Sequence, residues 1–303
     1  MLTTTKISLT DTLIPKATAP FDRFNARMIS NMSHSAPITT PRKDVRVRQV
    51  ALPTEHGGWA FLFEPLAAGM AIAFSSGAPW IAILTVGAFL TRQPLKVLIA
   101  DRFGMRNKAR ANLALRIFLG YGAIFALGIA GTLFTVGVQP LLPFVLVLPF
   151  AVFQIYIDAS GQSRKLIPEL TGAIVMSASI ASIGLSANMP FANAVALWTI
   201  FASRSIASIL YVRERLRLEK GKPYSRMMPA AAHVAALFLT ASLAYYGLSP
   251  FLTILAMSAL FYRSISGLSP GRSKMKAMQI GVWEIVYGIM VVLSVVIGLY
   301  AGF

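Results

Sequence analysis

The sequence contains no cysteine and few charged residues. Without cysteine the chain forms no disulfide, no thiolate metal site and no cysteine nucleophile, and redox chemistry by the protein itself is not expected. Only 13% of its 303 residues are charged, whereas 56% are hydrophobic, and the mean hydropathy is +0.66. Too little polar surface remains to solvate a globule of this size, so the composition excludes a soluble domain and predicts a membrane protein.

Long apolar stretches follow one another from Gly58 onward. Each has about 18 to 25 residues, which is enough to cross a hydrocarbon core of about 30 Å. We therefore expect an all-α polytopic membrane protein with about nine transmembrane helices. The expected spans are roughly 58–76, 79–99, 112–135, 139–157, 166–186, 189–211, 227–246, 248–264 and 278–301.

Residues 1–50 differ from the rest of the chain. They are rich in Ser, Thr, Pro and Arg and contain no apolar run of signal-peptide length. This composition is typical of a disordered segment, so we expect a cytosolic N-terminal tail before a transmembrane domain at 51–303.

Basic residues are concentrated in alternate breaks between the apolar spans. SSGAP, VGVQP, SANMP and GLSP carry no Lys or Arg, whereas RFGMRNKAR, RERLRLEKGKPYSR and SPGRSKMK are dense in them. The positive-inside rule then predicts a multi-pass protein of the cell (inner) membrane with a cytoplasmic N-terminus and, after nine crossings, an outside C-terminus.

The formal net charge of +17 would suit a protein that binds nucleic acid. The basic residues lack interleaved aromatics, however, and lie next to a bilayer that supplies phosphate itself. We therefore expect membrane lipids, and no nucleic acid, as partners.

A few basic residues lie inside the apolar spans, where a charge costs about 2.5 kcal/mol or more and is usually retained at a cavity or a partner. Arg92 and Lys96 share one face of span 79–99, with Asp101 at its end. Arg204 lies deeper in span 189–211. Tyr211 and Arg213 follow it toward the basic loop. These side chains are the candidate substrate-binding residues: Arg92, Lys96, Asp101, Arg204, Tyr211 and Arg213.

The two Arg-bearing spans also resemble each other. FLTR at 89–92 and FASR at 201–204 put a hydroxyl residue and an Arg at the same place, and each span then leads into a basic loop. This spacing predicts two parallel four-helix repeats, 55–158 and 164–265, plus one appended helix. The alternative is coincidence combined with the positive-inside rule.

Acidic and titratable residues mark the entrance of the first span, PTEHGGWAFLFEP. Glu55 and His56 lie at the expected interface and are candidate catalytic residues for proton transfer, since an imidazole titrates near neutral pH. Glu64 lies about two turns into the bilayer and requires a partner. We expect a Glu64–Arg pair, as a structural salt bridge or as part of a site. Glu169 and Glu284 lie inside later spans and are further candidates for proton transfer or cation binding.

Three segments carry a family resemblance: EHGGW at 55–59, RQPLKVLIADR at 92–102 and SRSIASILYVRERLR at 203–217. Together they resemble the YwiC-like family of bacterial membrane proteins. More distantly, the chain is similar to the UbiA superfamily of intramembrane prenyltransferases. That resemblance implies a nine-helix UbiA-like bundle with motifs at the cytoplasmic ends of the second and sixth helices, where aspartates hold magnesium and a prenyl diphosphate.

The chain departs from the aspartate-rich pattern of those enzymes. Arg92, Gln93 and Lys96 stand where the first acids are expected, and the sixth span offers Arg213. A single Asp101 cannot rebuild a two-site magnesium clamp, because magnesium prefers several carboxylate oxygens. We therefore expect no cofactor, with magnesium as the alternative, and any enzymatic activity would be that of a (prenyl)transferase with degenerate motifs.

Guanidinium groups match phosphate oxygens directly, which favours a cytoplasm-facing basic pocket for an anionic amphiphile such as a polyprenyl phosphate, a phospholipid or a quinone precursor. Two other hypotheses stay open. One is a transporter of an anionic solute, and the other is a non-catalytic assembly or regulatory partner of a membrane complex.

Overall fold

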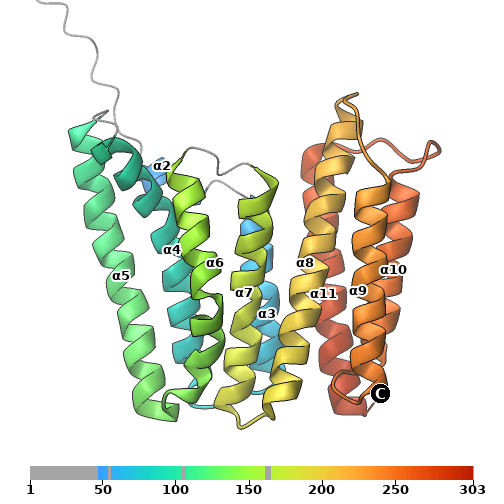
Figure 1. Cartoon of the computed structure of the whole chain (residues 1–303), viewed down its shortest axis with the longest axis horizontal. Coiled ribbons are helices and arrows are strands. Elements are labelled where there is room, and N and C mark those ends of the chain that lie inside the picture. The colour runs from blue at the N-terminus through green and yellow to red at the C-terminus, as the bar shows by residue number, and fades with distance from the viewer. Residues whose placement is uncertain (1–46, 54–55, 104–106, 161–164, 303) are drawn as a thin grey trace, which may run out of the picture. The chain divides into compact units, whose positions relative to one another are not determined.

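The computed structural model describes residues 47–53, 56–103, 107–160 and 165–302 (Figure 1). Most of the predicted tail, 1–50, and Glu55 lie outside these residues. Within them the chain is helical, and the helices are α2 (Val47–Ala51), α3 (His56–Ile72), α4 (Ala78–Phe103), α5 (Lys108–Val136), η1 (Gln139–Leu141), α6 (Leu142–Ala159), α7 (Leu166–Ser186), α8 (Phe191–Glu219), α9 (Met227–Tyr245), α10 (Leu252–Gly267) and α11 (Ala277–Ala301).

The long helices α3 to α11 correspond one by one to the nine expected spans, which confirms the all-helical polytopic fold class. Seven spans in the described chain are long and apolar enough to cross a membrane. The apolar parts of α3 and α10 are shorter, at Gly57–Ile72 and Leu252–Gly267. Helix α3 ends at Ile72, a few residues before the loop residues Ser75, Ser76 and Gly77, and α10 begins at Leu252, shortly after Pro250.

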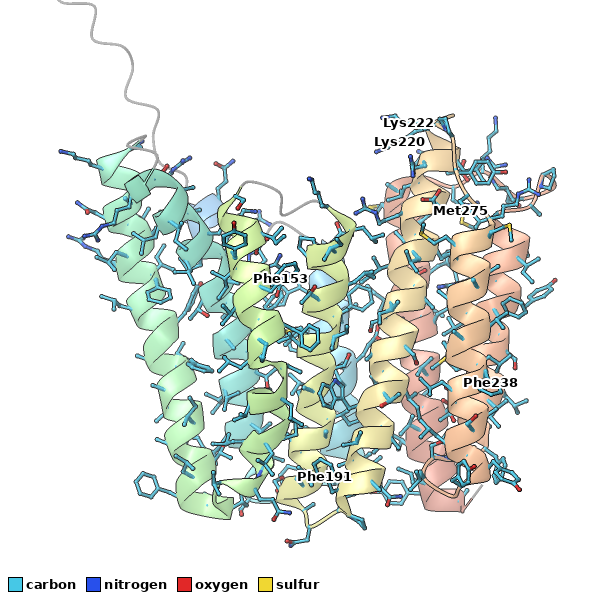
Figure 2. All side chains as sticks on the ribbon, in the orientation of Figure 1. Phe153, Phe191, Lys220, Lys222, Phe238 and Met275 are labelled. Atoms are coloured by element: carbon cyan, nitrogen blue, oxygen red, sulfur yellow. The ribbon has the colours of Figure 1, made fainter. Side chains whose placement is uncertain are left out.

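Helix α8 is longer than expected. It continues from Tyr211 to Glu219 through RERLRLE, which consists of strong helix formers. Lys220 and Lys222 follow at one end of the bundle, and Phe191 marks the opposite end (Figure 2). The apolar side chains of Phe153 and Phe238 are exposed on the sides of the bundle, as expected for surfaces that face lipid.

Six helices, α3, α7, α8, α9, α10 and α11, form a closed ring in which each packs against the next and α11 packs against α3. We call this the helix ring. Helix α8 also contacts α3, α10 and α11, so it reaches into the ring. Helices α4, α5 and α6 lie outside it: α4 packs against α5, α6, α7 and α3, and α6 packs against α7. The repeat hypothesis stays a prediction.

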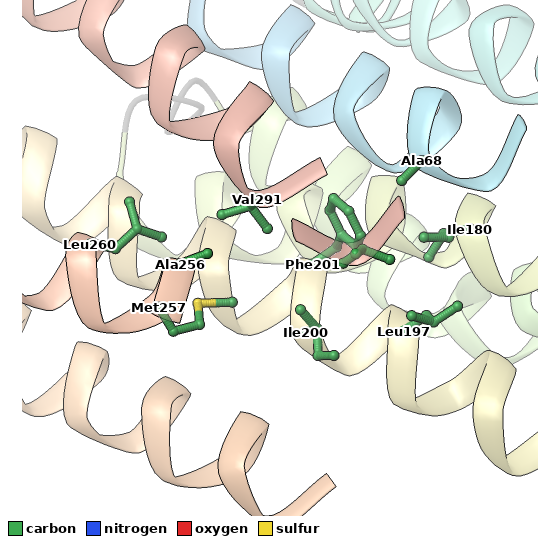
Figure 3. Close-up of a cluster of buried hydrophobic side chains, with 10 residues drawn as sticks. Ala68, Ile180, Leu197, Ile200, Phe201, Ala256, Met257, Leu260 and Val291 are labelled. Carbon is green, nitrogen blue, oxygen red and sulfur yellow. The ribbon is translucent and has the colours of Figure 1, made fainter. Parts of the chain in front are cut away.

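A cluster of buried apolar side chains lies between the helices of the ring (Figure 3). It consists of Ala68, Ile180, Leu197, Ile200, Phe201, Ala256, Met257, Leu260, Val291 and Val295. Along α8, α10 and α11 its residues lie farther from the basic loops than Arg204, Arg263 and Glu284 do. The buried charged residues of the ring lie on the other side of this cluster, nearer the basic loops. The interior is therefore polar at one end and apolar at the other.

Glycines allow α4 and α5 to approach closely. A Cβ atom on Gly128 would lie 2.3 Å from the backbone nitrogen of Leu84, and one on Gly131 would lie 2.2 Å from the ring of Trp80. Small residues at such contacts are typical of membrane helices, because no hydrophobic force drives helices together in lipid and close van der Waals packing has to replace it.

Candidate functional site

A cavity of about 330 Å³ lies at the basic end of the helix ring. Its walls come from α8, α10 and α11 and from the loop that joins α10 to α11. Three guanidinium groups line it, those of Arg215, Arg263 and Arg272, against one carboxylate of the described residues, that of Glu284. Tyr211, Trp283 and Tyr287 supply aromatic walls. The cavity is therefore basic and partly aromatic.

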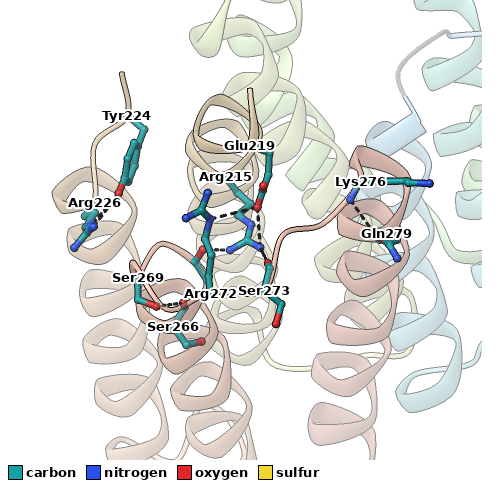
Figure 4. A network of polar contacts seen from close by, with 11 residues as sticks. Arg215, Glu219, Tyr224, Arg226, Ser266, Ser269, Arg272, Ser273, Lys276 and Gln279 are labelled. Carbon is teal, nitrogen blue, oxygen red and sulfur yellow. Dashed lines mark hydrogen bonds and ion pairs between the residues drawn. The ribbon is translucent and has the colours of Figure 1, made fainter. Parts of the chain in front are cut away.

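Arg215 ties the end of α8 to the loop above the cavity (Figure 4). Its side chain is only 2% exposed, forms an ion pair with Glu219 at 3.0 Å, and donates to the carbonyl of Ser273 at 2.6 Å and to that of Gly267. Arg272 from the loop reaches the same Glu219 carboxylate at 3.3 Å. Glu219 thus holds two of the three guanidinium groups in place.

Arg263 of α10 lies between two tyrosines in the floor of the cavity. Its guanidinium carbon is 4.4 Å from the ring centroid of Tyr211 and 4.7 Å from that of Tyr287. Arg263 also pairs with Glu284 at 2.5 Å and donates to Ser208 at 3.3 Å. Stacking on aromatic faces stabilises a buried cation and fixes its plane, so this guanidinium is preorganised.

A second ion pair lies deeper in the ring. Arg204 of α8 is completely buried and pairs with Glu64 of α3 at 2.9 Å, as expected from the sequence. Arg204 also donates to the backbone carbonyl of Glu284 at 3.1 Å. Glu284 therefore connects the deep pair to the Arg263 pair of the cavity. Since each buried Arg has a carboxylate beside it, the interior charges are largely compensated.

The candidate residues of the sequence analysis fall into separate groups. Tyr211 lines the cavity, and Arg204 adjoins it through Glu284. Arg213, on another face of α8, pairs with Glu169 of α7 at 2.8 Å.

The α4 candidates lie outside the helix ring. Arg92 pairs with Asp158 of α6 at 2.7 Å, and Asp101 pairs with Arg110 of α5 at 2.5 Å. Lys96 lies on the same helix. The structure thus does not bring these side chains to the cavity, because α4 packs mainly against α5, α6 and α7.

Of the two candidate catalytic residues, Glu55 lies outside the described residues, and His56 begins α3 with a side chain that is also outside them. Among the described residues there is no cluster of three or more side chains that could hold a metal ion.

Arg263 and Arg272 did not emerge from the sequence as site residues. Both lie near a basic helix end or loop, where the positive-inside rule already accounts for a cation. The sequence feature that points to this site is Glu284, because an acid inside an apolar span requires a partner. Only the packing of α10 against α11 identifies that partner as Arg263.

The long apolar helices and the buried, compensated charges define an integral membrane protein that crosses the bilayer several times. Residues 52–184 match the family model of the YwiC-like protein, which confirms the resemblance to the YwiC-like family. The match includes EHGGW and RQPLKVLIADR, whereas the cavity residues on α8, α10 and α11 follow it in the chain. No curated protein and no solved structure gives a significant match.

Proposed function

We propose that the protein binds an anionic amphiphile, with the head group in the basic cavity and the apolar tail along the lipid-facing side of α11. The observation that carries this proposal is the charge of the cavity wall, which contains three guanidinium groups and one carboxylate. Glu219 pairs with two of these guanidinium groups, so one positive charge remains in excess. Guanidinium groups in fixed orientations bind phosphate or carboxylate oxygens through short charge-assisted hydrogen bonds.

The size of the cavity supports a head group rather than a whole lipid. Small-molecule sites usually occupy about 300 to 1,000 Å³, and a cavity of about 330 Å³ is at the small end of this range. Trp283 lines the cavity and is also 48% exposed on α11, next to the exposed side chains of Val282 and Val286. A tail leaving the cavity beside Trp283 would therefore lie against an apolar helix face.

Polyprenyl phosphates, phospholipids and acidic quinone precursors all have the required form. The predicted orientation would open the cavity to the cytoplasmic leaflet. Two hypotheses are distinct from this proposal. One is that Glu55 and His56, whose side chains lie outside the described residues, assist proton transfer in a UbiA-like transferase. The other is that Arg92 and Lys96, which are not among the residues that line the cavity, hold a substrate.

The apolar cluster in the ring bears on the transporter alternative. Its side chains, among them Phe201, Met257 and Leu260, are almost completely buried and fill the ring beyond the ion pairs. A charged solute would have to pass this cluster, so binding at one end of the ring is better supported than passage through it.

Native mass spectrometry with lipid identification tests the proposal on the full chain purified in mild detergent. We expect an anionic amphiphile to remain bound to the wild-type protein. Removing one charged hydrogen-bond donor costs about 1.5–3 kcal/mol, so Arg272→Gln should weaken the affinity for the amphiphile roughly 10- to 100-fold and lower the bound fraction accordingly.

The matched control is Arg226→Gln. Arg226 is an exposed residue after α8 whose guanidinium donates to Tyr224 at 2.8 Å, away from the cavity wall. The proposal is wrong if the wild-type protein retains only the lipids of its surroundings and Arg272→Gln leaves them unchanged. Flux of an anion in vesicles or a stoichiometric protein partner, without a bound amphiphile, would favour the alternatives instead.

A further inference from the structure

Cationic and anionic side chains of the cavity wall both have buried polar atoms without a hydrogen-bond partner in the described chain. Arg215 and Arg263 use their terminal nitrogens in the contacts described above, but the Nε of each is buried and has no hydrogen-bond partner within the described chain. Glu284 accepts from Arg263 through Oε1. Its Oε2 is buried and also lacks a partner there. These three residues line the cavity, and within the described chain their side chains leave two donors and one acceptor unsatisfied.

Resting on the proposed function, we infer that the head group carries a hydrogen-bond donor, a hydroxyl or an ammonium group, close to its anionic group, and that Glu284 Oε2 accepts from this donor. The anionic oxygens then accept from Arg215 and Arg263. A buried polar group that loses water without gaining a partner is unfavourable. A ligand that satisfies the guanidinium groups alone would leave Glu284 Oε2 unpaired.

Electrostatic repulsion between the bound anion and Glu284 also favours a hydrogen-bond donor in the head group. A bare anion placed against Arg263 would also lie near the Glu284 carboxylate, because Arg263 Nη1 and Glu284 Oε1 are 2.5 Å apart. Two anionic groups that contact the same guanidinium repel each other. A proton-bearing group between the anion and Glu284 replaces this repulsion by a hydrogen bond.

The short distance also limits the ligand. Since Arg263 and Glu284 are in direct contact, the anion and the donor must be separated by only a few atoms. A phosphodiester with a hydroxyl or ammonium group two or three carbons away satisfies this condition. A phosphodiester that ends in a methyl group, or in a quaternary ammonium without N–H, does not.

The test uses the full chain in nanodiscs, with two pairs of guest lipids that have identical acyl chains. The first pair is phosphatidylglycerol against phosphatidylmethanol, which has the same charge but no hydroxyl. The second pair is phosphatidylethanolamine against phosphatidylcholine, which lacks N–H donors. Bound lipid is counted by native mass spectrometry in direct competition.

We expect the wild-type protein to prefer the donor-bearing member of at least one pair by about tenfold, which corresponds to one additional hydrogen bond of about 1.4 kcal/mol. The first pair reports on a hydroxyl donor and the second on an ammonium donor, so the comparison identifies which of them is bound. Glu284→Met, whose side chain has no oxygen to accept this hydrogen bond, should lose the preference. Glu169→Gln, which changes a carboxylate on α7 outside the cavity wall, should keep the preference.

Equal retention of both members in both pairs by the wild-type protein would overturn the inference, whatever the variants do. If none of the four lipids is retained above the level of the surrounding bilayer, and no endogenous amphiphile is retained either, the proposed function itself is wrong. Failure of this inference and failure of the proposed function thus give different results with the wild-type protein, so the distinction does not depend on whether a variant folds.

Discussion

Arg204 of α8 and Glu64 of α3 form an ion pair inside the helix ring at 2.9 Å, with side chains that are 0% and 8% exposed. Helix α11 leaves space for this pair because it has a glycine, Gly288, at the contact. A Cβ atom on Gly288 of α11 would lie 2.0 Å from Glu64 Oε1 and 3.0 Å from Arg204 Nη2. Three helices that are far apart in the sequence therefore meet at one pair of charges.

Removing Arg204 alone should destabilise the protein strongly. Arg204→Met leaves the Glu64 carboxylate buried without its counter-charge, and breaking a buried pair in this way costs about 3–5 kcal/mol. The double variant Glu64→Leu with Arg204→Met removes both charges and should recover most of this loss, since an apolar pair of similar volume is often neutral or better. Unfolding in mixed micelles measures both effects.

The Glu214–Arg217 pair provides the control for this experiment. Arg217 is 55% exposed in its pair with Glu214 at 3.1 Å, whereas Glu214 is only 8% exposed. Glu214 also accepts from the backbone N–H of Ser225 at 2.7 Å, so its carboxylate keeps a partner when Arg217 is replaced. Arg217→Met should therefore change the free energy of unfolding little. A loss for Arg204→Met as small as that for Arg217→Met would show that the buried pair does not hold the ring together.

Gly288→Ala should lower stability by about 1–3 kcal/mol, because the new methyl group overlaps the Glu64 carboxylate and forces the pair to move. Gly281→Ala on the same helix is the control, since no atom lies within 4 Å of a Cβ there. Alanine is the better helix former by about 1 kcal/mol, so this control should be neutral or slightly stabilising. Equal melting temperatures for the two variants would contradict the close approach at Gly288.

The contact between α4 and α5 gives a similar prediction. A methyl group at Gly128 would meet the backbone of Leu84, which cannot turn aside as a side chain can. Gly128→Ala should therefore separate the two helices and cost about 2 kcal/mol or more. Gly120→Ala on the same helix has open space around its Cβ and should leave the melting temperature unchanged or higher. The two melting temperatures are compared in the same detergent.

The predicted orientation can be tested directly because the chain has no cysteine of its own. Lys222 follows α8 in a basic loop, and Tyr246, which is 74% exposed, follows α9 at the opposite end. The positive-inside rule predicts that a membrane-impermeant maleimide labels Tyr246→Cys in intact cells and labels Lys222→Cys only after permeabilisation. The reverse pattern would invert the topology and place the cavity outside.

The sequence by itself determined the helical class, the nine apolar spans and the need for a partner at Glu64. These features depend on local properties: the length of an apolar run, the loop residues that end it, and the cost of a charge in hydrocarbon. The Glu64–Arg204 pair could be anticipated because few acids and few basic residues lie inside the spans, and each needs a counter-charge.

The tertiary structure decided which helices are neighbours, and no local property contains that information. The similar positions of Arg92 and Arg204 in their helices favoured one shared pocket, but α4 lies outside the helix ring and Arg92 pairs with Asp158 there. Arg272 joins Arg215 at the cavity because the α10–α11 loop folds back over the end of α8. Arg263 joins them because α10 packs against α8 and α11. Of the many basic residues at this end of the protein, only a few therefore line the cavity. Its single described carboxylate, Glu284, is linked to the buried Glu64–Arg204 pair.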